Sequence, residues 1–154
     1  MNSIDNRLAE LGIALPDVAK PVANYLPYVR SGNLIFTAGQ LPMQDGKLML
    51  TGLLGETVTI EQGHACARQC AINILAIAKA VTGDLGKVKR IVKLVGFVAG
   101  GHSFTDQPKV INGASDLFVE VFGEAGRLAR SAVGVSALPL NAPVEVEAVI
   151  EIED

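Results

Sequence analysis

The sequence lacks a membrane-spanning or secretory segment. No uninterrupted run of about eighteen apolar residues occurs, and the most apolar stretch, residues 71–81, contains Asn73 and Lys79. The first eleven residues carry three charged side chains and no apolar signal-peptide core. We therefore expect a core helix at residues 71–81 and a cytoplasmic protein with no membrane association.

The sequence also lacks an excess of basic residues. Its formal net charge is −3 and its pI is about 5.4, whereas a nucleic-acid-binding domain is normally basic. Lys87, Lys89, Arg90 and Lys93 lie close together in the sequence, and we interpret them as a solvated entrance to a strand. Nucleic acid is not an expected partner.

Cysteine is scarce, and its spacing is wrong for a disulfide or a metal site. Cys66 and Cys70 are four residues apart on a predicted helix, where two thiols are poorly placed to bond. His64 points to another helix face than Cys66, and neither CxxC nor HExxH occurs. We predict two small buried thiols, no metal and no cofactor.

Apolar residues, in contrast, are abundant. They make up 49% of the 154 residues, against 19% charged, and the mean hydropathy is +0.37. A chain of this length forms one domain with a substantial core. The surplus of apolar residues predicts a homo-oligomer, because subunit interfaces bury further apolar surface.

Periodicity and turn residues predict an α+β protein. Residues 1–20 form an N-terminal arm with a short helix at 3–11, capped by Ser3 and stopped by Gly12, and residues 21–154 form a single domain. Residues 13–27, punctuated by proline, are expected to be extended. The domain has a β-β-β-α-β-α-β-β order, with elements at residues 28–30, 34–38, 48–50, 59–81, 88–99, 105–122, 131–137 and 143–152.

Three details of these elements are predicted from residue type. Thr59 and Gln62 form a capping box at the start of the first long helix. Thr105 and Asp106 cap the second. The strand at 88–99 is nearly all apolar, which is typical of burial on both faces. Two long helices are expected on one face of a mixed sheet.

Arg130 heads the alternating apolar segment near the C-terminus. A guanidinium offers a planar fork of donors, which suits binding of a small carboxylate. The alternative is that Arg130 pairs with a carboxylate of a neighbouring residue.

Two separated motifs resemble the RidA/YjgF family. Asn24-Tyr25, followed by Thr-Ala-Gly-Gln-Leu-Pro at residues 37–42, is similar to its N-terminal signature. Arg130-Ser131, then Leu-Pro at 138–139 and Val-Glu-Val-Glu-Ala at 144–148, is similar to its C-terminal signature. The resemblance implies a chorismate-mutase-like fold in a homotrimer with clefts between subunits. It also implies a hydrolase that converts enamines and imines to 2-oxo acids and ammonia, although other members are named L-PSP-type endoribonucleases.

The resemblance implies a set of site residues. They are the carboxylate anchor Arg130, the backbone amide of Ala132, Gly39 at the end of the hairpin, Tyr25, the water-positioning Glu145, and Asn112. The family's usual cysteine is replaced by Ala132, and its Gly-Pro before the tyrosine by Ala23-Asn24. The arm and residues 50–59 are longer than in compact members. The chain therefore resembles a longer side branch.

Each of these residues also has a purely structural interpretation. Glu145 alternates with apolar residues and could face solvent on a strand; if partly buried, it could instead activate a water. Tyr25 could pack at a subunit seam or close the site of an adjacent chain. Asn112 could be a polar residue on a helix surface, and Gly39 could serve backbone geometry.

Three functions remain open at this point. The first is an enamine/imine deaminase acting on 2-aminoacrylate-like intermediates. The second is a non-catalytic protein that binds small carboxylates such as 2-oxo acids in the same cleft. The third is an RNA-cleaving enzyme, which the acidic pI disfavours.

Overall fold

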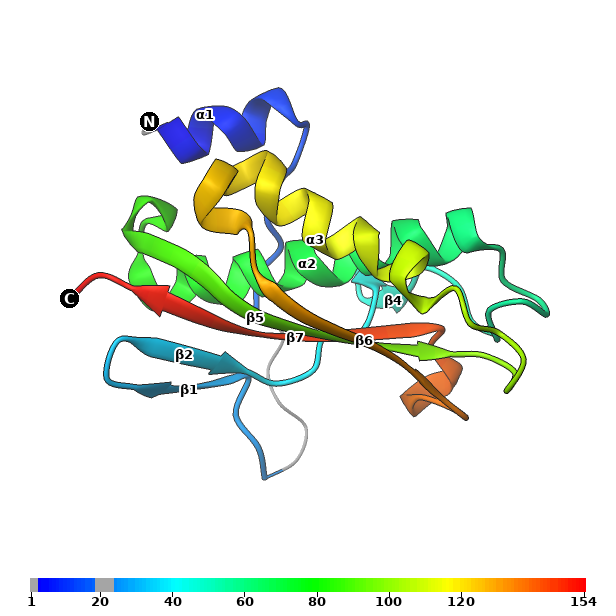
Figure 1. Ribbon diagram of the computed structural model, residues 1–154. Helices are drawn as coiled ribbons and strands as arrows, with labels where there is room; N and C mark the ends of the chain where they lie inside the picture. Colours follow the sequence, from blue (N-terminus) through cyan, green and yellow to red (C-terminus); the bar gives the residue numbers. More distant parts are fainter. Residues whose placement is uncertain (1–2, 19–23) are drawn as a thin grey trace.

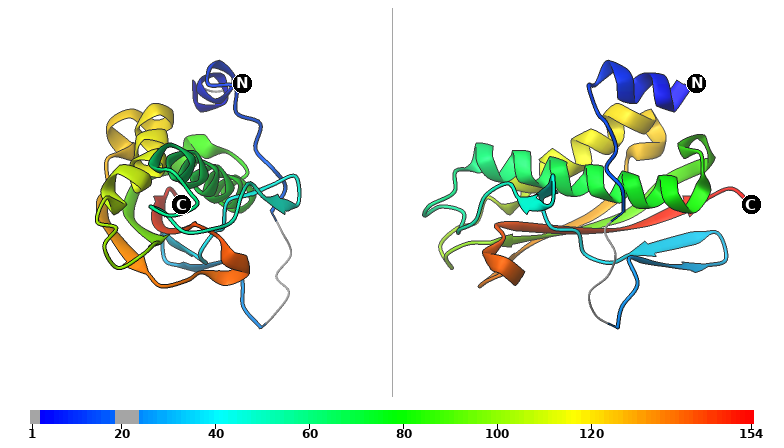
Figure 2. Two further views of the ribbon diagram at one scale, coloured as in Figure 1. Left: turned by 90° about the vertical axis from the view of Figure 1, so that its right-hand side faces the viewer. Right: turned by 180° about the vertical axis from the view of Figure 1, so that it is seen from behind.

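The computed structural model describes residues 3–18 and 24–154, and it has two layers. Helices α2 (Ile60–Thr82) and α3 (Gln107–Phe122) lie side by side on one face of a five-stranded sheet (Figures 1 and 2). The predicted α+β architecture with two helices on one face is confirmed. Within the described residues, no helix is long and apolar enough to span a membrane.

The sheet is mixed and has the strand order β1-β2-β7-β5-β6. β5 and β6 pair in parallel, because α3 connects them as a crossover, while the other neighbours are antiparallel. β6 begins two residues before the predicted strand, in register with Lys93 of β5. The strands are β1 (Tyr28–Ser31), β2 (Leu34–Thr37), β5 (Val88–Ala99), β6 (Ala129–Val135) and β7 (Val144–Ile152).

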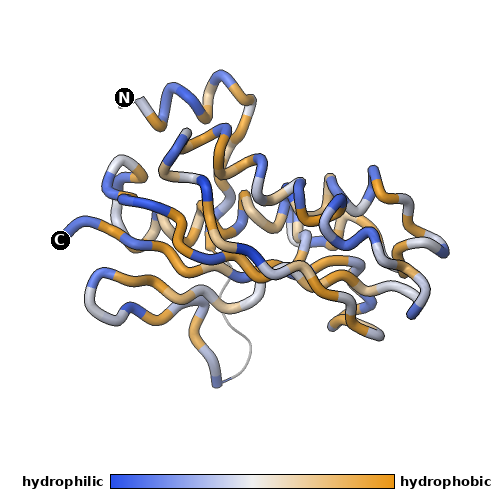
Figure 3. Tube along the Cα trace, viewed as in Figure 1, coloured by the Kyte–Doolittle hydropathy of each residue, from blue (hydrophilic) through white to orange (hydrophobic). Residues whose placement is uncertain are grey.

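The face of the sheet opposite the helices, here called the open face, is covered by no helix among the described residues. β7 alternates strictly between buried residues on the helix face and half-buried residues on the open face. The prediction that β5 is buried on both faces is wrong for the single chain, because Val95 and Phe97 are only half-buried there. Val29, Phe36 and Val133 on neighbouring strands are exposed. The open face therefore combines exposed apolar side chains with the glutamates of β7, and Figure 3 shows how hydrophobic and hydrophilic residues alternate along the strands.

The core lies between the helices and the sheet. Thr59 and Gln62 form the predicted capping box, with the Gln62 N–H donating to Thr59 Oγ1 at 3.1 Å and the Thr59 N–H donating to Gln62 Oε1 at 2.9 Å. Gly113 of α3 packs directly on the backbone of α2, where a Cβ would collide with the carbonyl oxygen of His64. Cys66 and Cys70 are free thiols inside this core, as predicted.

The start of α3 differs from the prediction. Asp106 occupies the N-cap position but makes no hydrogen bond through its side chain to the helix. Its carboxylate instead lies 3.6 Å from Lys109 Nζ. Pro108 in the first turn needs no N–H partner, so fewer donors are left to cap.

The N-terminal arm packs on the rest of the molecule. Helix α1 (Ser3–Glu10) lies against α3 and buries Leu8, and Ser3 is its first residue rather than its cap. Leu11 and Gly12 form a turn that ends the helix, and Leu11, Ile13 and Leu15 then contact the core. The predicted boundary between residues 20 and 21 lies outside the described residues.

A small hairpin follows the main one. β3 (Met43–Gln44) pairs with β4 (Lys47–Leu48), where one strand at residues 48–50 is predicted. Asp45 and Gly46 form the two-residue turn between β3 and β4. Their φ angles of 53° and 79° give this turn the twist that joins antiparallel strands. The difference is one additional short strand.

Candidate functional site

Arg130 is the second residue of the edge strand β6 and lies on the helix face. It is in register with Leu94, which is fully buried under the helices. Its Nη1 donates hydrogen bonds to Asn112 Oδ1 at 2.7 Å and to Ser115 Oγ at 3.1 Å, both on α3. Asn112 is thus bonded to Arg130 rather than free on a helix surface. Ser115 is an addition to the predicted site, and its spacing three residues after Asn112 is the signal that could have found it.

The charge of Arg130 has no carboxylate partner among residues 3–18 and 24–154. Both hydrogen bonds go to neutral oxygen atoms and both use Nη1. The alternative interpretation, that Arg130 pairs with a neighbouring carboxylate, is therefore wrong for the residues that the structure describes. A half-buried guanidinium with its other donors unbonded to described residues is suited to an anionic ligand.

Glu145 lies on β7, on the open face, and its carboxylate folds over Gly39. A Cβ on Gly39 would lie 2.7 Å from Glu145 Cδ and would collide with Oε2. Partial burial raises the pKa of Glu145, and the nearby negative charge of Glu147 raises it further. A carboxylate with a raised pKa is a better proton acceptor than an ordinary surface glutamate.

Gly39 has no unusual backbone conformation, so the explanation from backbone geometry is wrong. Its φ does not lie in the left-handed region that favours glycine. Gln40 beside it is fixed to β7, with N–H···O hydrogen bonds of 2.8 and 3.0 Å exchanged with Val146. The missing side chain instead makes room for the Glu145 carboxylate.

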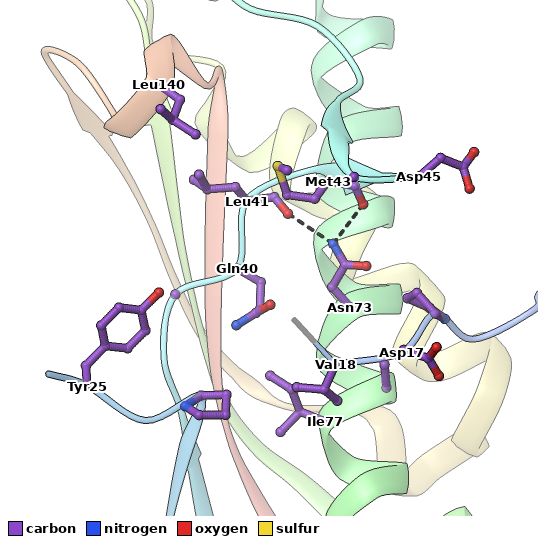
Figure 4. Close-up of a pocket in the computed structure, with 15 residues that line it drawn as sticks. Asp17, Val18, Tyr25, Gln40, Leu41, Met43, Asp45, Asn73, Ile77 and Leu140 are labelled. Atoms are coloured by element: carbon purple, nitrogen blue, oxygen red, sulfur yellow. Dashed lines mark hydrogen bonds between the residues drawn. The ribbon is translucent and has the colours of Figure 1, made fainter. Parts of the chain in front are cut away.

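A cleft of about 470 Å³ opens beside this glycine. Tyr25 stands at its mouth with 53% of its surface exposed, and its hydroxyl points towards the segment that carries Gly39 and Gln40 (Figure 4). Asn73 of α2 forms part of the far wall and donates to the carbonyl oxygens of Leu41 and Met43, both at 3.1 Å.

Asn73 is not among the residues that the sequence predicts for the site. The signal was its position as the one amide within the apolar stretch of residues 71–81. Gln69, one turn earlier, donates to Asn73 Oδ1 at 3.1 Å and so orients its amide. The pair holds the segment after β2 against α2, and that segment carries Gly39.

The predicted residues form two groups that one chain does not bring together. Tyr25, Gly39 and Glu145 form the first, and Arg130, Asn112 and Ala132 lie on α3 and β6. Glu145 is in register with Phe97 and Arg130 with Leu94, on opposite faces of the sheet. Glu145 and Arg130 lie two strands apart in the sheet and three residues apart along the strand direction. Their Cα atoms are therefore roughly 14 Å apart. Both groups can reach one small molecule only if different chains supply them.

The buried thiols are not nucleophiles. Burial raises the pKa of Cys66 to about 11 and that of Cys70 well above its ordinary value. Among the described residues, no three His, Cys, Asp or Glu side chains gather in a way that could hold a metal ion. The candidate chemistry therefore rests on Arg130 and Glu145.

Comparison with known proteins identifies the family to which this chain is related. Residues 5–152 match the family described as "YjgF/chorismate mutase-like, putative endoribonuclease". Protein TCP17 of Trypanosoma cruzi is 49% identical, over 96% of this chain and 92% of its own. A 2-iminobutanoate/2-iminopropanoate deaminase of Dermatophagoides farinae is 30% identical, over 92% and 95%.

The fold agrees with this relationship. The crystal structure of a protein of unknown function from Agrobacterium tumefaciens superposes with a TM-score of 0.90, at 49% identity, over 98% of this chain and 92% of that one. The sequence motifs, the mixed sheet with its two helices and the match along nearly the whole chain agree. The chain belongs to the RidA/YjgF family.

Proposed function

We propose that this protein hydrolyses enamine and imine intermediates derived from amino acids, of the 2-aminoacrylate type, to 2-oxo acids and ammonia. The observation that carries the proposal is the half-buried Arg130, whose charge meets only neutral acceptors in the described chain. A substrate carboxylate can occupy its remaining donors as a bidentate partner. The deaminase relative at 30% identity supports the same chemistry.

The reaction needs an anchored substrate, a directed water and proton transfer. The enamine first takes a proton on carbon and becomes the imine. Water then bonds to the imine carbon as the C=N electron pair moves to nitrogen, which is protonated. Glu145, with its pKa raised by burial, accepts a proton from this water. Glu145 then passes this proton to the amino nitrogen, the C–N bond breaks, ammonia leaves with the bonding electron pair, and loss of the hydroxyl proton to solvent gives the 2-oxo acid.

The site forms between chains in this proposal. Arg130, Asn112 and the backbone of Ala132 come from one chain, and Glu145, Gly39 and Tyr25 come from its neighbour. The large apolar side chains exposed on the open face, with Phe36 and Val133 exposed by 44% and 42%, support assembly through that surface. A homotrimer supplies three such sites by repeating one head-to-tail interface. Light scattering at micromolar concentration tests it: a monomer is incompatible with a site shared between chains.

The decisive experiment is ammonia release from enamines generated in place. Wild type, Arg130→Ala and Glu145→Ala are compared on the same precursors, with exposed Arg127→Ala as the matched control. We expect both site variants to lose turnover and the control to keep it. Full activity in Arg130→Ala would refute the proposed anchor.

A second candidate is a binder of small carboxylates without turnover. The same observation favours it, because an unpaired arginine binds a 2-oxo acid whether or not chemistry follows. It predicts Arg130-dependent binding of 2-oxo acids with no ammonia from any precursor. The third, RNA cleavage, has in its favour the family description and the similar description of a solved structure from Shewanella oneidensis, and has an acidic pI against it.

A further inference from the structure

The cleft beside Gly39 has a wall that comes from the N-terminal arm. Leu11, Ile13 and Leu15 anchor the arm on the core, and the next residues, 16–18, line the cleft. α2 contributes Asn73, Ala76 and Ile77 to the cleft. Asp17 and Val18 lie on the same side of it as Asn73 and Ile77, across from Tyr25 (Figure 4). The cleft is therefore built by a part of the chain outside the elements that carry Arg130 and Glu145.

The lining of this cleft is unsuited to a carboxylate. Its described residues include no lysine, arginine or histidine, whereas Asp17 and Asp45 are present. Most of the remaining side chains are apolar, with the amides of Gln40 and Asn73 between them. An anion would be repelled, while a hydrocarbon group would gain by leaving water. A carboxylate group is therefore expected to bind at Arg130 and not in this cleft.

Leu140 at the rim has an unusual conformation. Its φ of 59° is in the left-handed region, which is rare for a large residue, and 71% of its surface is exposed. The turn is held by N–H···O hydrogen bonds from Ala142 to Pro139 at 3.1 Å and from Gly52 to Asn141 at 3.0 Å. Strained residues of this kind concentrate at ligand-binding sites, and Leu140 lines the cleft.

We infer that the cleft receives the side chain of the substrate, and that the preferred substrates are imines of amino acids with large apolar side chains, such as leucine, methionine or phenylalanine. The inference rests on the proposed function and gives it a substrate class. Gly39 connects the cleft with the proposed catalytic carboxylate, because it lies against the Glu145 carboxylate and also borders the cleft. A volume near 470 Å³ far exceeds the need of a methyl group and falls within the range of small-molecule sites.

The first test is a ratio of rates. An amino-acid oxidase supplies the imine from leucine or from alanine, and semicarbazide traps what the protein has not hydrolysed. We expect wild type to favour the leucine-derived imine by about tenfold or more in kcat/KM, as buried methylenes allow. Ala76→Phe, which fills the cleft, should lower that ratio about tenfold, and Leu140→Ala should lower it less. Val119→Ala, an exposed aliphatic residue outside the cleft, should leave the ratio unchanged.

The second test separates this inference from the proposed function. Calorimetry compares binding of pyruvate with that of 4-methyl-2-oxopentanoate to wild type and Ala76→Phe. Tighter binding of the larger acid, lost in Ala76→Phe, supports the cleft even if no imine is hydrolysed. Turnover with equal rates and equal affinities for both side chains would overturn the inference and leave the proposed function standing. If Ala76→Phe unfolds at a lower temperature than wild type, Leu140→Ala, on the exposed rim, decides the ratio.

Discussion

Replacing Gly39 with alanine should abolish most activity without weakening the fold. The new Cβ would lie 2.7 Å from Glu145 Cδ, whereas nonbonded carbon atoms rest at about 3.5 Å or more. The carboxylate must therefore move by about 1 Å. A displacement of that size in a reacting group costs on the order of 100-fold in rate, or about 2.7 kcal/mol of transition-state stabilisation.

Stability should move in the opposite direction. Gly39 has an ordinary φ, so alanine can adopt its backbone conformation. Alanine also reduces the freedom of the unfolded chain, which stabilises a protein by about 0.4–1 kcal/mol. The colliding atoms belong to the end of a flexible side chain, which can rotate away. We expect an unchanged or higher Tm by up to a few degrees.

Ammonia release and a thermal melt on the same sample measure both effects. Gly101→Ala is the matched control, because its Cβ would face Glu56 Oε1 at 3.3 Å, with more room and away from the site. If Gly39 acts through Glu145, adding Gly39→Ala to Glu145→Ala should cost little further activity. A Gly39→Ala variant with kcat/KM within threefold of wild type would refute the reasoning.

The electrostatics of the site lead to four other predictions. Arg130→Lys should raise the Kd for 2-oxo acids by about 10- to 100-fold in calorimetry, because an ammonium replaces the bidentate fork. Asn112→Asp should raise KM, since a carboxylate 2.7 Å from Nη1 would compete with the substrate. Glu147→Gln should move the acidic limb of kcat/KM to lower pH, because it removes one cause of the raised pKa of Glu145, while Glu151→Gln should not. The raised pKa also means that the folded state binds a proton more tightly at Glu145 than the unfolded chain does. This contribution to stability is complete below the unfolded pKa and lost as pH rises through the folded one, so Glu145→Gln should melt above wild type at pH 7 but not at low pH.

Short-range sequence patterns were enough to predict most helices and strands of this fold. The capping box at Thr59 and the apolar stripe after it specify α2 through contacts within one helix. Alternation in the last strand likewise gives β7 its two faces. The prediction for β5 failed because an apolar strand has the same sequence pattern whether or not its own chain covers its second face.

The site was only partly accessible from sequence, because its geometry depends on long-range contacts. Ser115 and Asn73 matter through hydrogen bonds to Arg130 and to the segment after β2, each far away in the chain. The requirement for glycine at position 39 also comes from a distant part of the sequence. Glu145, more than a hundred residues later, occupies the space that a side chain at position 39 would fill. Motifs assigned Arg130 and Glu145 to the last two long strands, but only the sheet register revealed that the two residues face opposite ways.

The placement of Arg130 and Glu145 on opposite faces of the sheet leads to a direct test of the proposed site between chains. If Arg130 of one chain works with Glu145 of the next, Arg130→Ala and Glu145→Ala should each be inactive alone but complement each other when co-expressed. In a ring formed at random from equal amounts, a site is intact when one chain keeps its arginine and its neighbour keeps its glutamate, which occurs at about one site in four. About a quarter of wild-type ammonia release should return, with the same KM as wild type because the restored sites are complete. If both side chains acted within one chain, mixing would restore nothing. Mixed assemblies that are verified by mass spectrometry and remain inactive would therefore show that the two groups do not meet between chains.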